Sequence, residues 1–133
     1  MQHIDKISAK YEELQEKICN MTEHSDGRGR FSKDAWRKDI GYGTTRVISG
    51  GRKIWKGAVN FSKVSGPVSQ KMSDVLGVNA EKFSATGISS IFHGKNPFVP
   101  SIHMNVRYFS MNNGVEWFGG GVDLTPVYID AEQ

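Results

Sequence analysis

An alternation of polar and apolar side chains between residues 101 and 108 constrains the fold of this chain more than any other feature. The run Ser-Ile-His-Met-Asn-Val-Arg-Tyr-Phe is rich in apolar, branched and aromatic residues, which predicts a strand over residues 101–110. Side chains two residues apart share one face of a strand. We therefore expect His103, Asn105 and Arg107 to face one way, as a proton carrier, an amide and a guanidinium in a row.

The segment before this strand predicts an antiparallel neighbour. Residues 87–93 have strand composition and place Ser89 and His93 on one face. Residues 94–100 contain two prolines, which favour a loop over a central strand. Such a loop returns the chain antiparallel and brings His93 near His103.

A hairpin and a run of glycines follow. Asn113-Gly114 suits a turn with positive φ, and residues 115–118 predict a short third strand. Residues 119–121 are all glycine, which indicates a bulge, a tight bend, or a place where a flat ligand or another backbone comes close. Asp123 lies just beyond. Each polar residue alone is more often structural than functional, but together they predict an anion-binding pocket with a proton donor.

The remaining segments predict two helices and further strands. Residues 3–20 carry an apolar stripe at helical spacing, which predicts an amphipathic helix that docks on the sheet and ends at Asp26-Gly27. Residues 49–52 predict a hairpin turn, and residues 59–62 continue as strand. Pro67 predicts the start of a second helix, closed by Gly77.

Together these elements predict one α+β domain over residues 1–133, with a mainly antiparallel sheet flanked by helices. The sheet and second helix would occupy residues 31–130. No run approaches the roughly 18 apolar residues of a membrane span, and the N-terminus lacks a secretory signal pattern. The single cysteine, Cys19, excludes an internal disulfide and is expected to be a small, partly buried helix residue. A cytoplasmic location is therefore the expectation.

Three segments resemble the signature blocks of one enzyme family. They are GAVNFSKVSG, GISSIFHGKNPFVPSIHMNVRYF and WFGGGVDLTPVY. In this order they are similar to blocks of oxygen-dependent coproporphyrinogen III oxidase, and the resemblance covers residues 31–130. It implies the fold of that family in truncated form, because the family pattern continues beyond the last block and this chain resembles its N-terminal portion.

The resemblance implies roles for individual residues. Ser89, Asn105, Val106 and Arg107 match substrate-binding positions, and Arg107 would grip a propionate with both ends of its guanidinium fork. Of the catalytic positions, His103 matches a proposed proton donor.

Two further roles follow from the same resemblance. Asp123 matches an aspartate proposed to handle pyrrole N–H protons. His93 and His103 match positions proposed as ligands of a divalent metal cation.

The resemblance also implies a reaction. The family uses O2, without an organic cofactor, to decarboxylate two propionates of coproporphyrinogen III oxidatively to vinyl groups, giving protoporphyrinogen IX in heme biosynthesis. A homodimer is expected of the full-length family member, and this chain is expected to be incomplete for activity. The alternative is a non-catalytic module that binds a tetrapyrrole or another polycarboxylate.

A basic segment raises a third function. Residues 26–56 contain nine basic and three acidic residues with interleaved aromatics, so their net charge of +6 exceeds the +3 of the whole chain. A solvated surface is the commonest interpretation of such a run, and attraction of a polycarboxylate substrate comes second. Nucleic-acid binding ranks last because no known nucleic-acid motif is present; our prediction is that the chain binds none.

Overall fold

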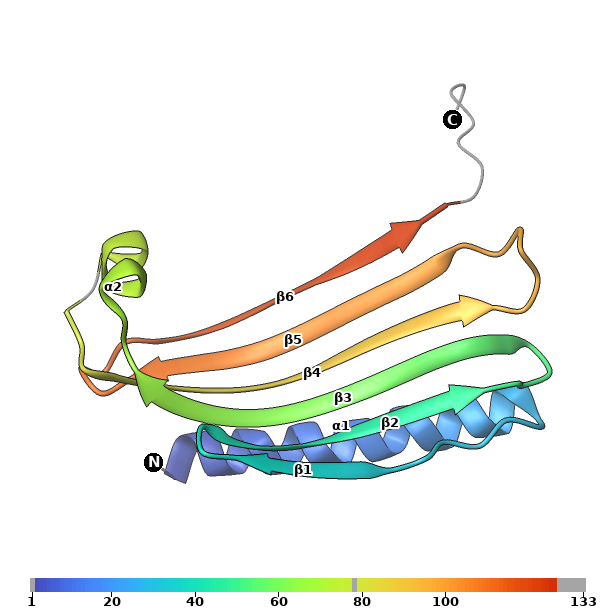
Figure 1. Ribbon diagram of the computed structural model, residues 1–133, viewed down its shortest axis with the longest axis horizontal. Helices are drawn as coiled ribbons and strands as arrows, with labels where there is room; N and C mark the ends of the chain where they lie inside the picture. The colour runs from blue at the N-terminus through green and yellow to red at the C-terminus, as the bar shows by residue number, and fades with distance from the viewer. Residues whose placement is uncertain (1, 78, 127–133) are drawn as a thin grey trace, which may run out of the picture.

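A computed structural model describes residues 2–77 and 79–126 as a single curved antiparallel sheet with a long helix along one face (Figure 1). The sheet order is β1-β2-β3-β4-β5-β6, so each strand pairs with its neighbours in sequence. The strands are β1 Asp34–Lys38, β2 Gly41–Ser49, β3 Ile54–Pro67, β4 Lys82–Gly94, β5 Ser101–Met111 and β6 Glu116–Thr125; the helices are α1 Gln2–Asp26 and α2 Gln70–Leu76. The predicted α+β class and antiparallel sheet are confirmed.

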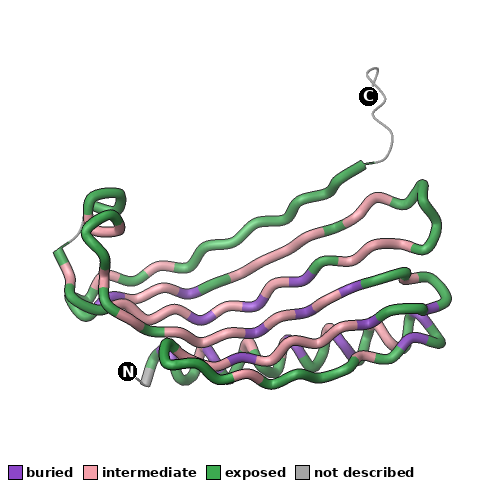
Figure 2. Tube along the Cα trace, in the orientation of Figure 1, coloured by how far each residue is buried: buried purple, intermediate pink, exposed green. Residues whose placement is uncertain are grey.

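The core lies between α1 and the central strands. Helix α1 packs mainly over β3 and β4. Cys19 of α1 meets Val59 and Ile88 there, and the apolar stripe predicted for the helix packs around them. Burial of this stripe removes apolar area from water, which is the main stabilising contribution of the contact. Figure 2 shows that buried residues gather on α1 and the strands near it, whereas β6 is exposed along most of its length.

A buried amide fixes how α1 lies on the sheet. The side chain of Gln15 donates hydrogen bonds to the carbonyl oxygens of Thr44, at 2.9 Å, and Val59, at 3.0 Å. These bonds satisfy a polar group that burial would otherwise make costly. Cys19, one turn further on, is fully buried, and burial raises the pKa of its thiol to about 11. The thiol therefore stays protonated at neutral pH, as expected of a structural residue.

The carboxylate of Asp26 ties the end of α1 to the β2–β3 turn. It is 2% exposed and accepts hydrogen bonds from five backbone N–H groups: those of Arg28, Gly29, Arg52, Lys53 and Ile54. Burial alone would raise the pKa of this carboxyl, but the hydrogen bonds hold it well below the usual range. Gly51 permits the approach, because a Cβ there would lie 2.5 Å from a carboxylate oxygen.

The two helices differ from their predicted bounds. Helix α1 extends past residue 20 and ends at Asp26, followed by Gly27 at φ 84°, so the predicted stop is confirmed. Helix α2 does not start at Pro67, which ends β3. Its cap is Ser69, whose hydroxyl accepts a hydrogen bond from the backbone N–H of Met72 at 3.1 Å. The predicted closing residue, Gly77, is confirmed in the left-handed conformation.

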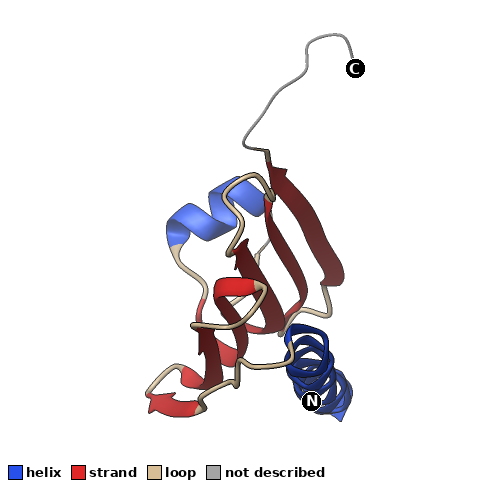
Figure 3. Ribbon diagram, turned by 90° about the vertical axis from the view of Figure 1, so that its right-hand side faces the viewer, coloured by secondary structure: helices blue, strands red, loops and turns tan. Residues whose placement is uncertain are grey.

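Helix α2 does not bury the apolar face that its sequence suggests. It contains no buried residue, and Val75 is 76% exposed. Figure 3 shows α1 against one face of the sheet and α2 on the other side. Among the described residues, only α1 therefore covers a face of the sheet. Neither described helix is both long and apolar enough to cross a membrane.

The strand predictions were right in place but short in length. The loop predicted at residues 94–100 is confirmed over 95–100, because Gly94 ends β4, and the turn at Gly114, with φ 91°, is confirmed. The third strand, expected at 115–118, continues as β6 to Thr125. The three glycines are therefore part of a regular strand rather than a bend, and each pairs with a residue of β5. Strand β1 was not predicted.

Candidate functional site

The predicted polar residues gather on the face of the sheet opposite α1, here called the open face. Residue pairing aligns Ser89 of β4 with Asn105 of β5, and Asn105 with Gly121 of β6. On the other side of Ser89 lies Asn60 of β3. One row of amide and hydroxyl groups thus crosses β3, β4 and β5 and ends on a glycine. The sequence predicted two of its polar members, but not Asn60.

Arg107 occupies the next row of the open face. Its partners are Gly87 on β4 and Gly119 on β6. Neither neighbour carries a side chain, so the exposed guanidinium is bordered by bare backbone on both sides. Its five N–H donors are free of any acidic cross-strand neighbour, which leaves their fork geometry suited to an incoming carboxylate.

His103 and Asp123 form a direct cross-strand pair. They occupy opposite positions on β5 and β6, and the Cβ atoms of such pairs lie about 4.5–5.5 Å apart. His103 is half-buried and Asp123 is exposed. The sequence indicated both residues separately but not their pairing, which depends on the register of β6. An imidazole beside a carboxylate can hold and pass a proton.

A cavity of about 240 Å³ joins the two polar rows. Its polar lining comes from Asn60, Ser62, Ser89, Asn105 and Arg107. Asn60 and Ser62 were missed, although the alternation Val59-Asn60-Phe61-Ser62 already indicated that they share one face of a strand. Since hydrogen-bond donors converge here without a neighbouring carboxylate, the cavity suits an anionic or carbonyl-bearing ligand.

Val106 faces away from this cavity. Its side chain packs against the core beneath α1, as the alternation between Asn105 and Arg107 requires. A substrate on the open face can therefore meet only its backbone.

His93 lies on the open face but is engaged elsewhere. Along β4 it lies two residues beyond Ile91, and Ile91 pairs with His103 on β5. Its Nδ1 is 2.7 Å from the Ser101 hydroxyl, and its ring meets Trp55 edge-on. Among residues 2–77 and 79–126, no group of three histidine, cysteine or acidic residues is placed to hold a metal ion. Protein metal sites ordinarily use three or more such ligands, so these residues do not complete a site and the metal role stays a prediction.

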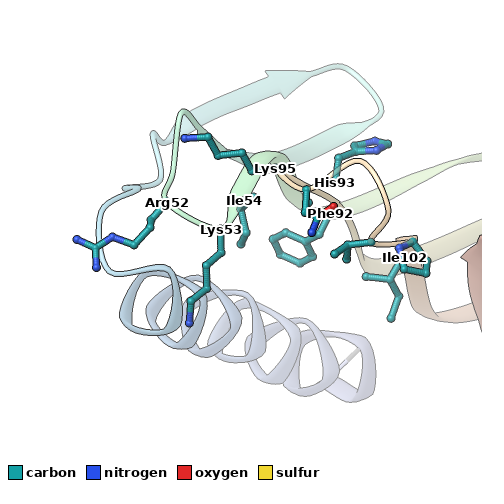
Figure 4. Close-up of a pocket in the computed structure, with 11 residues that line it drawn as sticks. Arg52, Lys53, Ile54, Phe92, His93, Lys95 and Ile102 are labelled. Atoms are coloured by element: carbon teal, nitrogen blue, oxygen red, sulfur yellow. The ribbon is translucent and has the colours of Figure 1, made fainter. Parts of the chain in front are cut away.

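A larger hollow lies toward the end of the sheet where α1 ends. It has a volume of about 720 Å³ and an apolar floor of Ile54, Phe92 and Ile102. Figure 4 shows Ile54 and Phe92 near the end of α1, Ile102 further from it, and the His93 ring pointing away from Phe92. No predicted site residue except His93 borders this hollow, so size alone does not locate the chemistry.

Comparison with known proteins shows the family of this chain. The family described as coproporphyrinogen III oxidase matches residues 6–133. Two proteins named oxygen-dependent coproporphyrinogen-III oxidase, from Prochlorococcus marinus strains MIT 9312 and AS9601, are 42% and 41% identical to this chain over 122 residues. Each alignment covers 86% of this chain and 34% of the relative, so the chain spans about a third of the length of the curated relatives it matches. The chain belongs to the coproporphyrinogen III oxidase family.

Proposed function

We propose that this chain supplies the substrate-binding face of an enzyme that oxidatively decarboxylates two propionates of coproporphyrinogen III to vinyl groups, with O2 as co-substrate and no organic cofactor. The observation that carries the proposal is the register of the open face. Ser89, Asn105 and Arg107 surround one cavity, and His103 pairs with Asp123 two residues further along the same strands.

Arg107 would bind a propionate of the substrate. A guanidinium accepts a carboxylate through two parallel N–H···O bonds, which fixes its direction as well as its position. Ser89, Asn105 and Asn60, across from Arg107 in the cavity, supply further hydrogen-bonding groups for a second carboxylate or a pyrrole N–H. The net +6 charge of residues 26–56 adds a long-range attraction for a tetracarboxylate.

His103 and Asp123 would move protons during the reaction. For each propionate, the bond to the carboxylate carbon breaks and CO2 leaves, one C–H bond next to the pyrrole breaks, and a C=C bond forms. The two electrons released pass to O2, which with two protons gives hydrogen peroxide. His103 would donate a proton to the reduced oxygen, and Asp123, its cross-strand partner, would accept one from a pyrrole N–H.

Product formation tests this proposal directly. The chain is incubated in air with coproporphyrinogen III, and vinyl-bearing product and released CO2 are quantified. We expect the His103→Asn variant to retain substrate binding, measured without oxygen, while product formation falls by about 10²-fold or more, the contribution of a positioned proton donor. Wild-type rates in that variant would remove His103 from the mechanism.

A binding module without turnover is the second candidate. It is favoured by the exposure of Arg107 and Asp123, because oxygen chemistry needs a site closed to water. This candidate predicts that coproporphyrinogen III binds without oxygen and is recovered unchanged after incubation in air.

Our proposal also includes a homodimer and a cytoplasmic location. Sedimentation of the chain tests the homodimer.

A further inference from the structure

We propose that Gly119 and Gly121 form a bare floor on which one pyrrole ring of the substrate lies flat, bounded at one end by the stacked rings of Phe83, Phe109 and Trp117. This inference rests on the proposed function and adds the part of the open face that recognises the ring rather than its carboxylates. The three rings are called the aromatic wall below.

The chain itself does not need glycine at positions 119 and 121. A Cβ at either position would meet no atom within 4 Å, and neither residue has a positive φ. Glycine inside a strand is costly because it loses more backbone freedom on folding and offers no side chain for packing. The strand therefore carries two destabilising residues for which its own packing gives no reason.

Gly120, in contrast, is a glycine that the packing of the chain itself requires. It points to the α1 side, where a Cβ would lie 2.5 Å from the carbonyl oxygen of Asn105 and 3.1 Å from the Cα of Val106. Close backbone packing thus accounts for Gly120, whereas its two neighbours border open space. Glycines of the latter kind are typical of a surface that a ligand approaches closely.

The position of the bare floor matches the rest of the site. Gly119 pairs with Arg107 and Gly121 with Asn105, so the floor lies beside the proposed propionate clamp. Gly121 is also next to the His103–Asp123 pair, two residues further along β6. A ring on this floor would lie beside Arg107 and Asn105, and a ring linked to it would lie beside the His103–Asp123 pair.

The aromatic wall closes the other end of the floor. The rings of Trp117 and Phe109 are 4.5 Å apart with an interplanar angle of 23°, and those of Phe109 and Phe83 are 5.3 Å apart at 4°. Trp117 comes two residues before Gly119, so it shares the open face with the floor. All three rings are only half-buried. Their free edges can contact another aromatic ring, an arrangement that aromatic pairs favour.

The distance along β5 between the aromatic wall and His103 indicates which class of ligand fits the open face. Phe109 and His103 are separated by six residues of β5, or about 20 Å of extended chain. A single pyrrole cannot touch both the aromatic wall and the acid–base pair. A linked series of rings can, with one ring on the floor and a neighbouring ring at His103.

Matched glycine variants separate this inference from a structural role. Gly119→Ala, Gly121→Ala and the control Gly120→Ala are each compared with the wild type by equilibrium dialysis against coproporphyrinogen III without oxygen, with the ligand quantified as fluorescent porphyrin after oxidation. Thermal unfolding is measured on the same samples. We expect the first two variants to bind about tenfold or more weakly, since a methyl group holds the ring off the floor. Their Tm should stay equal or rise, whereas Gly120→Ala should lower the Tm.

The Arg107→Gln variant distinguishes failure of this inference from failure of the proposed function. If Arg107→Gln weakens binding while Gly119→Ala and Gly121→Ala bind like the wild type, the bare floor is wrong and the proposed function stands. A fall in Tm that accompanies weaker binding in Gly119→Ala and Gly121→Ala would also overturn the bare floor, because the two glycines would then be structural. If the wild type binds no coproporphyrinogen III, both proposals fall.

Discussion

The two faces of the sheet are made from adjacent residues of the same strands, yet they differ in almost every physical property. On the α1 side, Val59 and Ile88 are buried in the apolar core. The next residues along, Asn60 and Ser89, line the cavity on the open face. A shift of one position along the chain therefore separates a residue that holds the fold together from one that lines the open cavity.

This division lets folding and recognition use different side chains. Because side chains alternate with a period of two, the apolar set can satisfy the core while the polar set is left free for a ligand. The same arrangement fixes the register strongly, since a slip of one residue would put Asn105 beneath α1 and Val106 on the open face. The core therefore positions the site without contributing side chains to it.

The largest expected effect compares two neighbours on β4. Ile88→Ala should lower the free energy of unfolding by about 4 kcal/mol, because it removes a fully buried side chain and leaves a cavity. Ser89→Ala, on the open face, should change it by less than about 0.5 kcal/mol. Urea unfolding of both variants measures the difference. Equal losses would show that the open face is as tightly packed as the α1 side.

The second prediction removes the anchor between α1 and the β2–β3 turn. Asp26→Asn should lower the free energy of unfolding by about 3 kcal/mol, the scale of charged hydrogen bonds lost from a buried carboxylate. Asp39→Asn, an exposed change of the same kind, is the control and should have little effect.

The same residue predicts the pH dependence of the wild type. The pKa of Asp26 is lower in the folded chain than its unfolded value of about 3.9. Its stabilisation is therefore fully present above that unfolded pKa and is lost as the pH falls through the folded pKa. Unfolding measured from pH 6 to pH 2 should show a loss in the wild type that Asp26→Asn lacks. Parallel curves for the two proteins would contradict the low pKa.

The third prediction tests the open face by binding. Arg107→Ala should weaken affinity for coproporphyrinogen III by about 1.5–3 kcal/mol, roughly ten- to hundredfold, the scale of a charged hydrogen bond. Its stability should stay close to wild type because the side chain is exposed. Arg37→Ala on β1 makes the same change in charge far from the cavity. If both variants lose affinity equally, general electrostatic attraction explains binding and the clamp is wrong.

Local sequence patterns predicted the strands that carry their own side-chain alternation or turn signal. The alternation over residues 101–110 and the turn residues Asn113-Gly114 specify β5 and its hairpin without help from other segments. Residues 34–38 are mostly polar and carry no such pattern. They form β1 because their backbone pairs with the adjacent strand β2 across the turn at residues 39–40, a pairing that their side-chain pattern does not reveal.

The misses at the site have the same physical origin. The glycines 119–121 favour a bend locally, but pairing with β5 holds them in a strand. The alternation in β3 predicts that Asn60 and Ser62 share one face of a strand. It does not place them beside Ser89, because the register between strands is set by the whole sheet. At α2, Pro67 and Ser69 are both helix-start signals, and the hydrogen bond from the Met72 N–H to the Ser69 hydroxyl decides between them.

The smallest predicted effect concerns the residue that the sequence did not single out. Asn60→Ala should weaken coproporphyrinogen III binding by about 1 kcal/mol, roughly fivefold, since one neutral hydrogen bond is lost. Asn60 lies directly across from Ser89, so the double variant with Ser89→Ala should lose less than the sum of the two single changes. Thr45→Ala, one strand further out in the same row, is the control and should bind like the wild type. If Thr45→Ala and Asn60→Ala weaken binding equally, the ligand extends onto β2 and the polar site is wider than the cavity.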